Sequence, residues 1–371
     1  MKFIVEKDIF FNGLKIVERA TVAKGLQPVL ANILIESISS DTLKLTATHF
    51  DLTVITTINA QIEREGKITL PAKRLSDIIS RLGNAPINFE IDDNSTALIT
   101  SGKAKFDIIG ISASEFPVIE ENNEVTDSID IELKPFITCA KMTGFAAANY
   151  ETNNLLSGVI CSINDNILEM ASTDGNRLSR AKEFVKNEEH KEFSMIVPSK
   201  ILAEFARMTS YIEEENVTIS KEKSKIIFNT GSTRMISRLM EGQYPKYNQL
   251  IPTGFAKQAL VNREKLISAL EIVSTMINDK TSIVKFEFTD GSLKLNADAP
   301  DAGAGEDEVE ISYSGEDMLI AFNFRYLLDF LKIVEVEEVL IQMNTNLSAV
   351  VIRPKSEDDY LYLIMPVQMR V

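Results

Sequence analysis

A threefold internal repeat constrains the fold of this chain more than any other feature of the sequence. Three six-residue segments align with offsets of 125 and 125 residues: Leu43–Thr48, Leu168–Thr173 and Leu293–Asp298. In each segment apolar and polar residues alternate, which predicts a half-buried β-strand. Because self-similarity at a fixed period is typical of repeated structural units, the sequence predicts three copies of one domain.

The length of the chain and the segments between the copies define the expected domains. With 371 residues, of which 44% are hydrophobic, the chain is globular and too long for a single core. Phe116-Pro117 closes the first copy and Tyr244-Pro245 closes the second, and polar segments that predict linkers follow both pairs. We therefore expect three domains of about 125 residues, at 1–120, 129–250 and 255–371.

Each copy is expected to contain the same elements in the same order. An amphipathic helix lies within residues 1–20, 129–148 and 260–277, and strands of alternating polarity and a second, shorter helix follow it. This order predicts an α+β fold in which every domain packs two helices on two antiparallel β-sheets.

The second helix of each copy carries two cations. The pairs are Arg74 and Arg81, Lys200 and Arg207, and Arg325 and Lys332, and the members of each pair are seven residues apart. Seven residues are about two helical turns, so both cations of a pair lie on one face. The apolar residues take another face: Leu75, Ile78, Ile79 and Leu82; Ile201, Leu202, Phe205 and Met208; and Phe324, Leu327, Leu328 and Leu331. One such pair is usually a solvated face, but three pairs in register indicate a shared role.

The chain is acidic overall, but its charged residues are unevenly distributed. A net charge of −15 argues against a nucleic-acid partner, because such proteins are usually basic over the contact domain. The acidic residues, however, gather in predicted turns and linkers, at 120–124, 188–189, 213–215, 306–308 and 357–359. Together with the basic helices, this pattern indicates a particle that is acidic outside and basic on one internal face.

Several classes of protein are disfavoured by what the sequence lacks. No segment approaches the ~18 apolar residues of a membrane span, and the first residues lack the order of a signal peptide, so we expect a soluble, cytoplasmic protein. Cys139 and Cys161 are the only cysteines, which argues against a disulfide framework or a thiolate metal site. Both are expected to be buried small hydrophobic residues.

The sequence shows no convincing catalytic or metal site. His49 and His190 are the only histidines, and their neighbours lack metal-ligand spacing. Gly102-Lys103 lacks the upstream glycine of a phosphate-binding loop. The acidic stretches Asp92-Asp93-Asn94 and Asp174-Gly175-Asn176 are better explained as turns between strands. We therefore expect no enzymatic activity, no cofactor and no metal.

Two other classes of function stay open at this point. A scaffold of three repeats that binds only proteins is consistent with the repeats and the acidity, but not with basic pairs in register. A metal-dependent nuclease is consistent with nucleic-acid affinity, but it needs converging carboxylates that the sequence does not provide.

Short stretches along the whole chain carry a family resemblance. They are the opening MKFIVEKD, Leu70-Pro-Ala-Lys-Arg, Glu115-Phe-Pro, Thr173-Asp-Gly-Asn-Arg-Leu, Ile196-Val-Pro-Ser-Lys, Glu241-Gly-Gln-Tyr-Pro, Tyr313-Ser-Gly, Phe322-Asn-Phe-Arg-Tyr and Leu363-Ile-Met-Pro. In this order and spacing the chain resembles the bacterial DNA sliding clamp, the beta subunit of the replicative DNA polymerase III holoenzyme. The resemblance implies a homodimer that closes head to tail into a six-domain ring, the DNA clamp fold. It also implies a processivity factor that encircles duplex DNA without reading its sequence.

The resemblance further implies partners and residue roles. The partners are the replicative polymerase, clamp-loader ATPase subunits and repair proteins, all of which bind through short peptides. DNA contacts fall on Lys24, Lys73, Arg74, Tyr150 and Lys200, beside the other cations of the basic helices. The partner-peptide pocket falls on Thr173, Gly175, Arg177, Leu178, Pro245, Leu250, Asn323, Tyr326, Leu347, Met365 and Pro366. The dimer interface falls on Phe106 and Ile108, facing Ile272 and Met276. Asn154 and Leu155 replace expected aromatic residues, and the tail Val367-Gln368-Met369 extends the usual ending.

Overall fold

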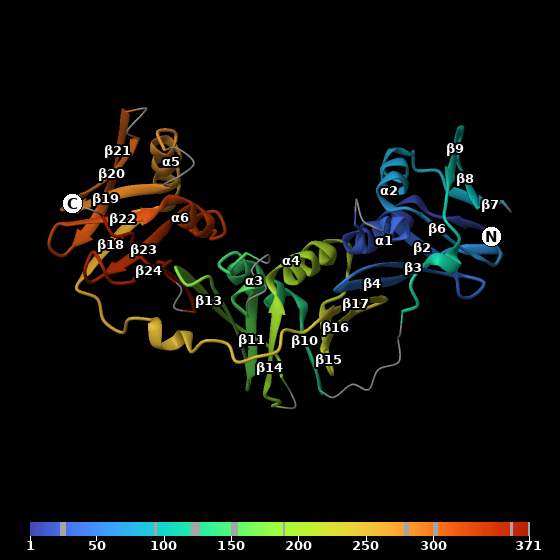
Figure 1. Cartoon of the computed structure of the whole chain (residues 1–371), viewed down its shortest axis with the longest axis horizontal. Helices are drawn as coiled ribbons and strands as arrows, with labels where there is room; N and C mark the ends of the chain where they lie inside the picture. The colour runs from blue at the N-terminus through green and yellow to red at the C-terminus, as the bar shows by residue number, and fades with distance from the viewer. Residues whose placement is uncertain are drawn as a thin grey trace. The chain divides into compact units, whose positions relative to one another are not determined.

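The structure is a computed structural model of the chain (Figure 1). It describes residues 1–22, 27–92, 95–119, 127–149, 155–187, 190–277, 282–299, 303–356 and 359–369. The chain forms two compact units. We call residues 1–134 with 201–239 the N-terminal unit, and residues 135–200 with 240–371 the C-terminal unit.

The N-terminal unit contains two antiparallel sheets. The larger has the strand order β10 (Asp127–Glu132), β15 (Asn216–Glu222), β16 (Lys225–Thr230), β17 (Thr233–Arg238), β4 (Leu52–Asn59), β3 (Thr42–His49), β2 (Asn32–Ser37) and β6 (Lys67–Pro71). The smaller has the order β5 (Gln61–Arg64), β1 (Lys2–Val5), β7 (Ile87–Ile91), β8 (Thr96–Ser101) and β9 (Ala104–Ile109). The second and first repeats therefore share a continuous sheet, because β17 pairs with β4.

Helices α1 (Lys7–Val17) and α2 (Ala72–Arg81) pack against each other in this unit, and α1 also covers β3 and β4 (Figure 1). Phe10 of α1 lies edge-on to the ring of Phe3, which stacks on the ring of Phe89 at 4.5 Å. Helix α4 (Ser199–Met208) lies in the N-terminal unit from Ile201 onward. Phe205 of α4 stacks on Phe228 at 4.6 Å, which anchors the apolar side of that helix.

The C-terminal unit is built on one long antiparallel sheet. Its order is β14 (Phe193–Pro198), β11 (Gly158–Asn164), β12 (Ile167–Thr173), β13 (Arg177–Phe184), β25 (Tyr360–Ile364), β24 (Val350–Pro354), β23 (Glu338–Met343), β18 (Lys257–Asn262), β21 (Gly303–Ser314), β20 (Ser292–Ala299), β19 (Ile283–Thr289) and β22 (Met318–Asn323). The pairing of β13 with β25 joins the second repeat to the third in the same way as β17 joins β4.

Helices α5 (Arg263–Ser274) and α6 (Phe324–Leu331) pack together in this unit, and α5 covers β18, β20 and β21 (Figure 1). Asn262 and Asn323 cap them, since each side chain accepts a hydrogen bond from a backbone amide of the first turn. Helix α3 (Leu133–Gly144) lies in this unit from Pro135 onward. The hydroxyl groups of Ser179 and Tyr360 both donate to the Met142 carbonyl oxygen of α3.

Short 3-10 helices complete the described chain, at Glu18–Ala20, Pro28–Ala31, Ala113–Glu115, Leu155–Ser157, Thr209–Tyr211 and Tyr247–Leu250. The last of them lies in the segment that the sequence predicted to be a linker, so this linker contains a helical turn. The three repeated strands and the three basic helices lie where the sequence predicted them. Cys139 and Cys161 are free thiols that are buried, as expected.

Candidate functional site

Helix α2 presents three cations that form no ion pair with another described residue. Lys73, Arg74 and Arg81 are exposed, while Leu75 and Ile79 on the opposite side are fully buried. Within the described part of the chain, none of the three cations forms an ion pair. The helix therefore offers an unneutralised basic face, as the spacing of Arg74 and Arg81 predicted.

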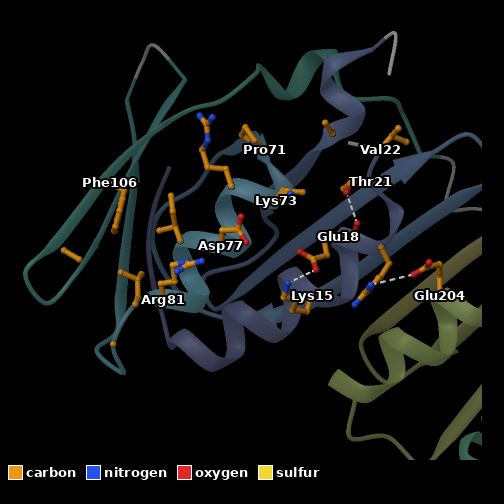
Figure 2. A pocket seen from close by; sticks show the side chains of 18 residues that line it. Lys15, Glu18, Thr21, Val22, Pro71, Lys73, Asp77, Arg81, Phe106 and Glu204 are labelled. Carbon is orange, nitrogen blue, oxygen red and sulfur yellow. Dashed lines mark hydrogen bonds and ion pairs between the residues drawn. The ribbon is translucent and has the colours of Figure 1, made fainter. Parts of the chain in front are cut away.

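A hollow of about 1120 Å³ lies beside this face, within the N-terminal unit. Figure 2 shows Lys73 and Arg81 on α2, Lys15 on α1 and Phe106 on β9 around it. Lys15 is paired with Glu18 at 2.8 Å, whereas Arg81 lines the hollow without such a partner among the described residues. The hollow thus combines free positive charge with the exposed edge of a sheet.

The basic faces of α4 and α6 differ from that of α2. Lys200 is exposed and makes no ion pair with another described residue. Arg207 lies 2.6 Å from Glu204, and Lys332 lies 2.8 Å from Glu271. Arg325 is exposed, and its guanidinium lies 5.9 Å from the ring of Phe324. The sequence located all of these cations, but it did not reveal that two of them are partly neutralised.

The turn between β12 and β13 brings several predicted pocket residues together in the C-terminal unit. The Thr173 hydroxyl donates to the Arg177 carbonyl oxygen at 2.6 Å and accepts from the Gly175 amide at 3.1 Å. Gly175 has a φ of 93°, a left-handed conformation that glycine adopts without strain. The Met365 amide then donates to the Asn176 carbonyl oxygen at 2.8 Å, which places the C-terminal segment beside the turn.

Arg177 is the central polar group of this turn. Its guanidinium donates to Asp174 at 3.0 Å, to Asp329 of α6 at 2.6 Å and to the Phe145 carbonyl oxygen at 2.9 Å. It also lies 4.3 Å from the centre of the Tyr326 ring. Burial lowers the pKa of Arg177, but its hydrogen-bonded and charged neighbours outweigh burial and leave this pKa raised.

These contacts define what the Arg177 side chain does in this unit. The side chain of Arg177 is only 10% exposed, and its three nitrogen atoms all have protein acceptors. It therefore ties the turn to Phe145, just beyond the end of α3, and to Asp329 of α6.

An apolar cluster forms beside the same turn. Leu178 is 1% exposed and packs with Val351, Leu361 and Leu363, and residues of the folded linker, Tyr247, Ile251 and Phe255, lie against them. The Tyr247 hydroxyl donates to Glu169, which also accepts from Lys182 at 3.1 Å. The linker is thus tied to the second repeat by both apolar packing and a polar anchor.

Tyr244, at the start of this linker, is held in a similar way. Its hydroxyl donates to the Gly158 carbonyl oxygen at 3.1 Å and accepts from the Thr173 amide at 3.3 Å. Burial raises the pKa of Tyr244 to about 12. The hydroxyl therefore stays protonated and keeps both contacts at neutral pH.

The remaining predicted pocket residues differ in exposure. Leu250, Leu347 and Met365 are 57%, 62% and 40% exposed, which are high values for apolar side chains. Pro245 is exposed, Tyr326 and Pro366 are half-buried, and Asn323 uses its side chain to cap α6. Beyond Pro366 the tail continues along the sheet, because the Val367 amide donates to the Ala321 carbonyl oxygen at 2.8 Å.

The predicted interface residues lie on a sheet edge in one unit and on a helix in the other. Strand β9 ends its sheet, and Phe106 on it is 38% exposed. Ile108 is only 1% exposed, so its side chain belongs to the core of its own unit and is not on the surface. The exposed isoleucine of this strand is Ile109, at 76%. On α5, Ile272 is 54% exposed, and Met276 just beyond the helix is half-buried.

Some functional residues could not be predicted or lie outside the described residues. Lys24 and Tyr150, both predicted DNA contacts, and Asn154 are among the residues that the structure does not describe. The roles of Tyr247, Glu169 and Asp329 were missed, because a contact between distant segments leaves no local pattern. Among the described residues, no group of three or more His, Cys, Asp or Glu side chains could hold a metal ion.

Comparison with known proteins places the whole chain in one family. Residues 1–120, 130–246 and 248–368 match the N-terminal, central and C-terminal domains of the DNA polymerase III beta subunit. The beta sliding clamp of Synechococcus elongatus is 34% identical over the full length of both chains. That of Chlamydia muridarum is 31% identical and covers 100% of this chain and 99% of its own.

Solved structures agree with this assignment. The DNA polymerase III beta subunit of Thermotoga maritima superimposes with a TM-score of 0.91 at 27% identity, over 100% of both chains. The sliding clamp of Pseudomonas aeruginosa bound to griselimycin gives a TM-score of 0.89 at 26% identity, again over 100% of both chains.

The matches and the α+β repeats together define a protein of the DNA clamp class. The chain belongs to the family of DNA polymerase III beta subunits, the beta sliding clamps. No helix among the described residues is long and apolar enough to cross a membrane.

Proposed function

We propose that two copies of this chain join head to tail into a closed ring that encircles duplex DNA and tethers the replicative polymerase to it. Each copy would contribute three domains, at 1–120, 129–250 and 255–371. A head-to-tail contact gives a closed assembly only when its rotation completes a full turn, and six similar domains from two chains satisfy that condition. The ring acts by topology, so it needs neither a catalytic group nor a cofactor.

The observation that carries this proposal is the unneutralised basic face of α2. Duplex DNA carries about one negative charge per 1.7 Å, so exposed lysine and arginine side chains are attracted to it without reading bases. Lys73, Arg74 and Arg81 are assigned to the lining of the ring, with Lys200 and Arg325. Arg207 and Lys332 contribute less, because each already has a carboxylate partner. Loose contacts of this kind allow the ring to slide.

Two unpaired strand edges support the subunit contact. Strand β9 has no partner on its outer side among the described residues, and the segment 303–310 of β21 pairs only with β20 there. Exposed Lys103 and Lys105 lie at the first edge, and exposed Glu306 and Glu308 lie at the second. Pairing the two edges between subunits would remove both as aggregation sites and bring opposite charges together. Phe106 would then pack against Ile272 and Met276.

The apolar cluster beside the β12–β13 turn is assigned to partner peptides. The exposed Leu250, Leu347 and Met365 are assigned the apolar contacts with the peptide, and Leu178 is buried in the cluster itself. A groove of this kind concentrates affinity in one or two buried anchors, and methionine adapts its shape to different anchors. Polymerase, clamp-loader ATPase and repair proteins would compete for it. A protein with these partners acts in the cytoplasm.

The test is retention on DNA of defined topology. The protein is loaded on nicked circular DNA with the clamp-loader ATPase, and the DNA is then linearised. The proposal predicts retention on the circle and release from the linear form. Phe106→Asp, which places a charge at the subunit contact, should give monomers that are not retained. Degradation of the DNA would indicate a nuclease instead, and failure of the wild-type protein to stay on the circle would indicate a protein-binding scaffold.

A further inference from the structure

The N-terminal unit repeats the geometry of the β12–β13 turn at the turn between β3 and β4. Thr48 pairs with Thr53 across the first turn, and Thr173 pairs with Leu178 across the second, at an offset of 125 residues. In both cases the same hydrogen bond joins the turn to the neighbouring segment of the sheet. The Arg238 amide donates to the Asp51 carbonyl oxygen at 3.3 Å, and the Met365 amide donates to the Asn176 carbonyl oxygen at 2.8 Å. The chain therefore has two equivalent turns, of which only one has an assigned role.

A hollow of about 280 Å³ lies beside the β3–β4 turn. Its apolar lining comes from Leu52 and Ile236 of the sheet and from Val118 and Ile119 of the first linker. Val118 is 93% exposed, and Phe50, at the turn itself, is 83% exposed. The volume is below the range of about 300–1,000 Å³ that is typical of small-molecule sites. It suits a single large side chain better than a free ligand.

The charges at the rim of this hollow favour an anionic partner. Lys225 and Arg238 lie directly opposite each other on β16 and β17, and two like charges in such a pair repel. Asp51 lies 3.1 Å from Arg238 and offsets part of that repulsion. Glu222, on the other side of Lys225, is buried and pairs with Arg234 at 3.5 Å. Two cations and one carboxylate, Asp51, therefore line the rim of the hollow. A carboxylate from a partner would balance the second positive charge.

Phe50 is the most unusual residue of the turn. It has a φ of 25°, whereas Gly175 at the equivalent position has the left-handed φ of 93° that suits glycine. A left-handed backbone costs a bulky residue free energy, and such strain persists where the side chain has a use. An exposed aromatic ring beside an apolar hollow is typical of a contact surface.

We propose that this hollow is a second docking site, which binds an extended segment of a partner protein carrying one large apolar side chain next to a carboxylate. The apolar side chain enters between Ile119 and Ile236, and Phe50 covers it. The carboxylate binds between Lys225 and Arg238. This site lies within the N-terminal unit. It depends neither on ring closure nor on the partner-peptide site beside the β12–β13 turn.

The probe is a fluorescein-labelled peptide, Gly-Ser-Glu-Leu-Phe-Glu-Ser-Gly, and a matched peptide has lysine at both glutamate positions. Binding to the full-length chain is followed by fluorescence anisotropy at fixed ionic strength, without DNA. We expect two glutamate peptides to bind per chain, one of them lost in Met365→Ala. In that variant, adding Phe50→Gly or Arg238→Gln should weaken the remaining site about tenfold. The lysine peptide should not bind there.

A matched control removes a charge nearby without touching the hollow. Lys223 is exposed at the turn between β15 and β16 and does not line the hollow, so Lys223→Gln should leave the affinity unchanged. Phe50→Gly should remain folded, because glycine accepts the backbone conformation of this turn. The proposal is wrong if only one peptide binds per chain and Met365→Ala abolishes it. Equal affinity for the lysine peptide, or unchanged affinity in Phe50→Gly and Arg238→Gln, would contradict it as well.

Discussion

The turn between β3 and β4 and the turn between β12 and β13 have the same strand register but different chemistry. In the second turn, Gly175 allows a tight backbone and Arg177 ties the turn to its surroundings. In the β3–β4 turn, Phe50 takes the position of Gly175 and Leu52 takes that of Arg177. Arg238 takes the position that Met365 has beside the β12–β13 turn.

This difference separates what the backbone determines from what the side chains determine. The backbone of the repeat places a strand end, a linker and a turn side by side in both units. The side chains then make one site apolar and place two cations at the rim of the other. A duplicated fold can thus present two surfaces of different specificity without a new element.

The largest expected effect tests the role of Arg177 in holding its turn. Arg177→Ala should lower the free energy of unfolding by about 3 kcal/mol, because Asp174 and the Phe145 carbonyl oxygen would lose a partly buried partner. Guanidinium unfolding followed by circular dichroism measures the change. Arg207→Ala, which removes an exposed arginine, is the matched control and should cost less than about 0.5 kcal/mol. Equal effects of the two substitutions would mean that Arg177 is not a structural tie.

The next effect separates the two grooves by their ligands. Met365→Ala should weaken a clamp-motif peptide by about 1–3 kcal/mol, because a buried anchor loses its apolar contact. Arg238→Ala, at the equivalent position of the other turn, should leave that peptide unaffected. Fluorescence anisotropy measures both, with sedimentation to check that the dimer is intact. Unchanged affinity in a well-folded Met365→Ala dimer would place the peptide elsewhere, with the tail around Gln368 as the first alternative.

A smaller effect is expected in how stability depends on pH, because only the second linker begins with a tyrosine. Burial raises the pKa of Tyr244 to about 12, against about 10 in an unfolded chain. Its contribution to stability is therefore complete below about pH 10 and is lost as the pH rises toward 12. Phe116, the equivalent residue of the first linker, has no hydroxyl to titrate.

Tyr244→Phe gives the second linker the residue that the first linker has at the equivalent position, Phe116. It should cost about 1 kcal/mol at neutral pH, since two hydrogen bonds are lost. It should also reduce the fall in melting temperature between about pH 10 and pH 12. An identical alkaline profile in wild type and variant would show that this hydroxyl does not control the effect.

The smallest effect concerns the backbone of the first turn. Phe50→Gly should change the free energy of unfolding by less than about 1 kcal/mol, because relief of strain and the entropy cost of glycine oppose each other. Gly175→Phe, the reverse exchange, should destabilise the second turn by about 1–3 kcal/mol. Thermal melts of both variants measure the asymmetry. Similar losses in the two variants would show that the turns differ less than their φ angles indicate.

Local patterns in the sequence predicted much of the fold and part of the sites. Alternation of polarity located the repeated strands, and a spacing of seven residues located the exposed cations of α2, α4 and α6. The pairings of β17 with β4 and of β13 with β25 were not predicted, because register between distant segments depends on tertiary packing. For the same reason the sequence did not predict that Ile108 is buried or that Glu204 and Glu271 neutralise two of the cations.

The most direct test of a topological clamp is its residence time on linear duplex DNA with free or blocked ends. Fluorescently labelled protein is loaded by the clamp-loader ATPase, and its dissociation is followed on single molecules whose ends are either open or capped by a bound protein. A ring that slides leaves through open ends and stays when both ends are capped, and its residence time does not depend on the DNA sequence. Equal residence times on open and capped molecules would contradict the account.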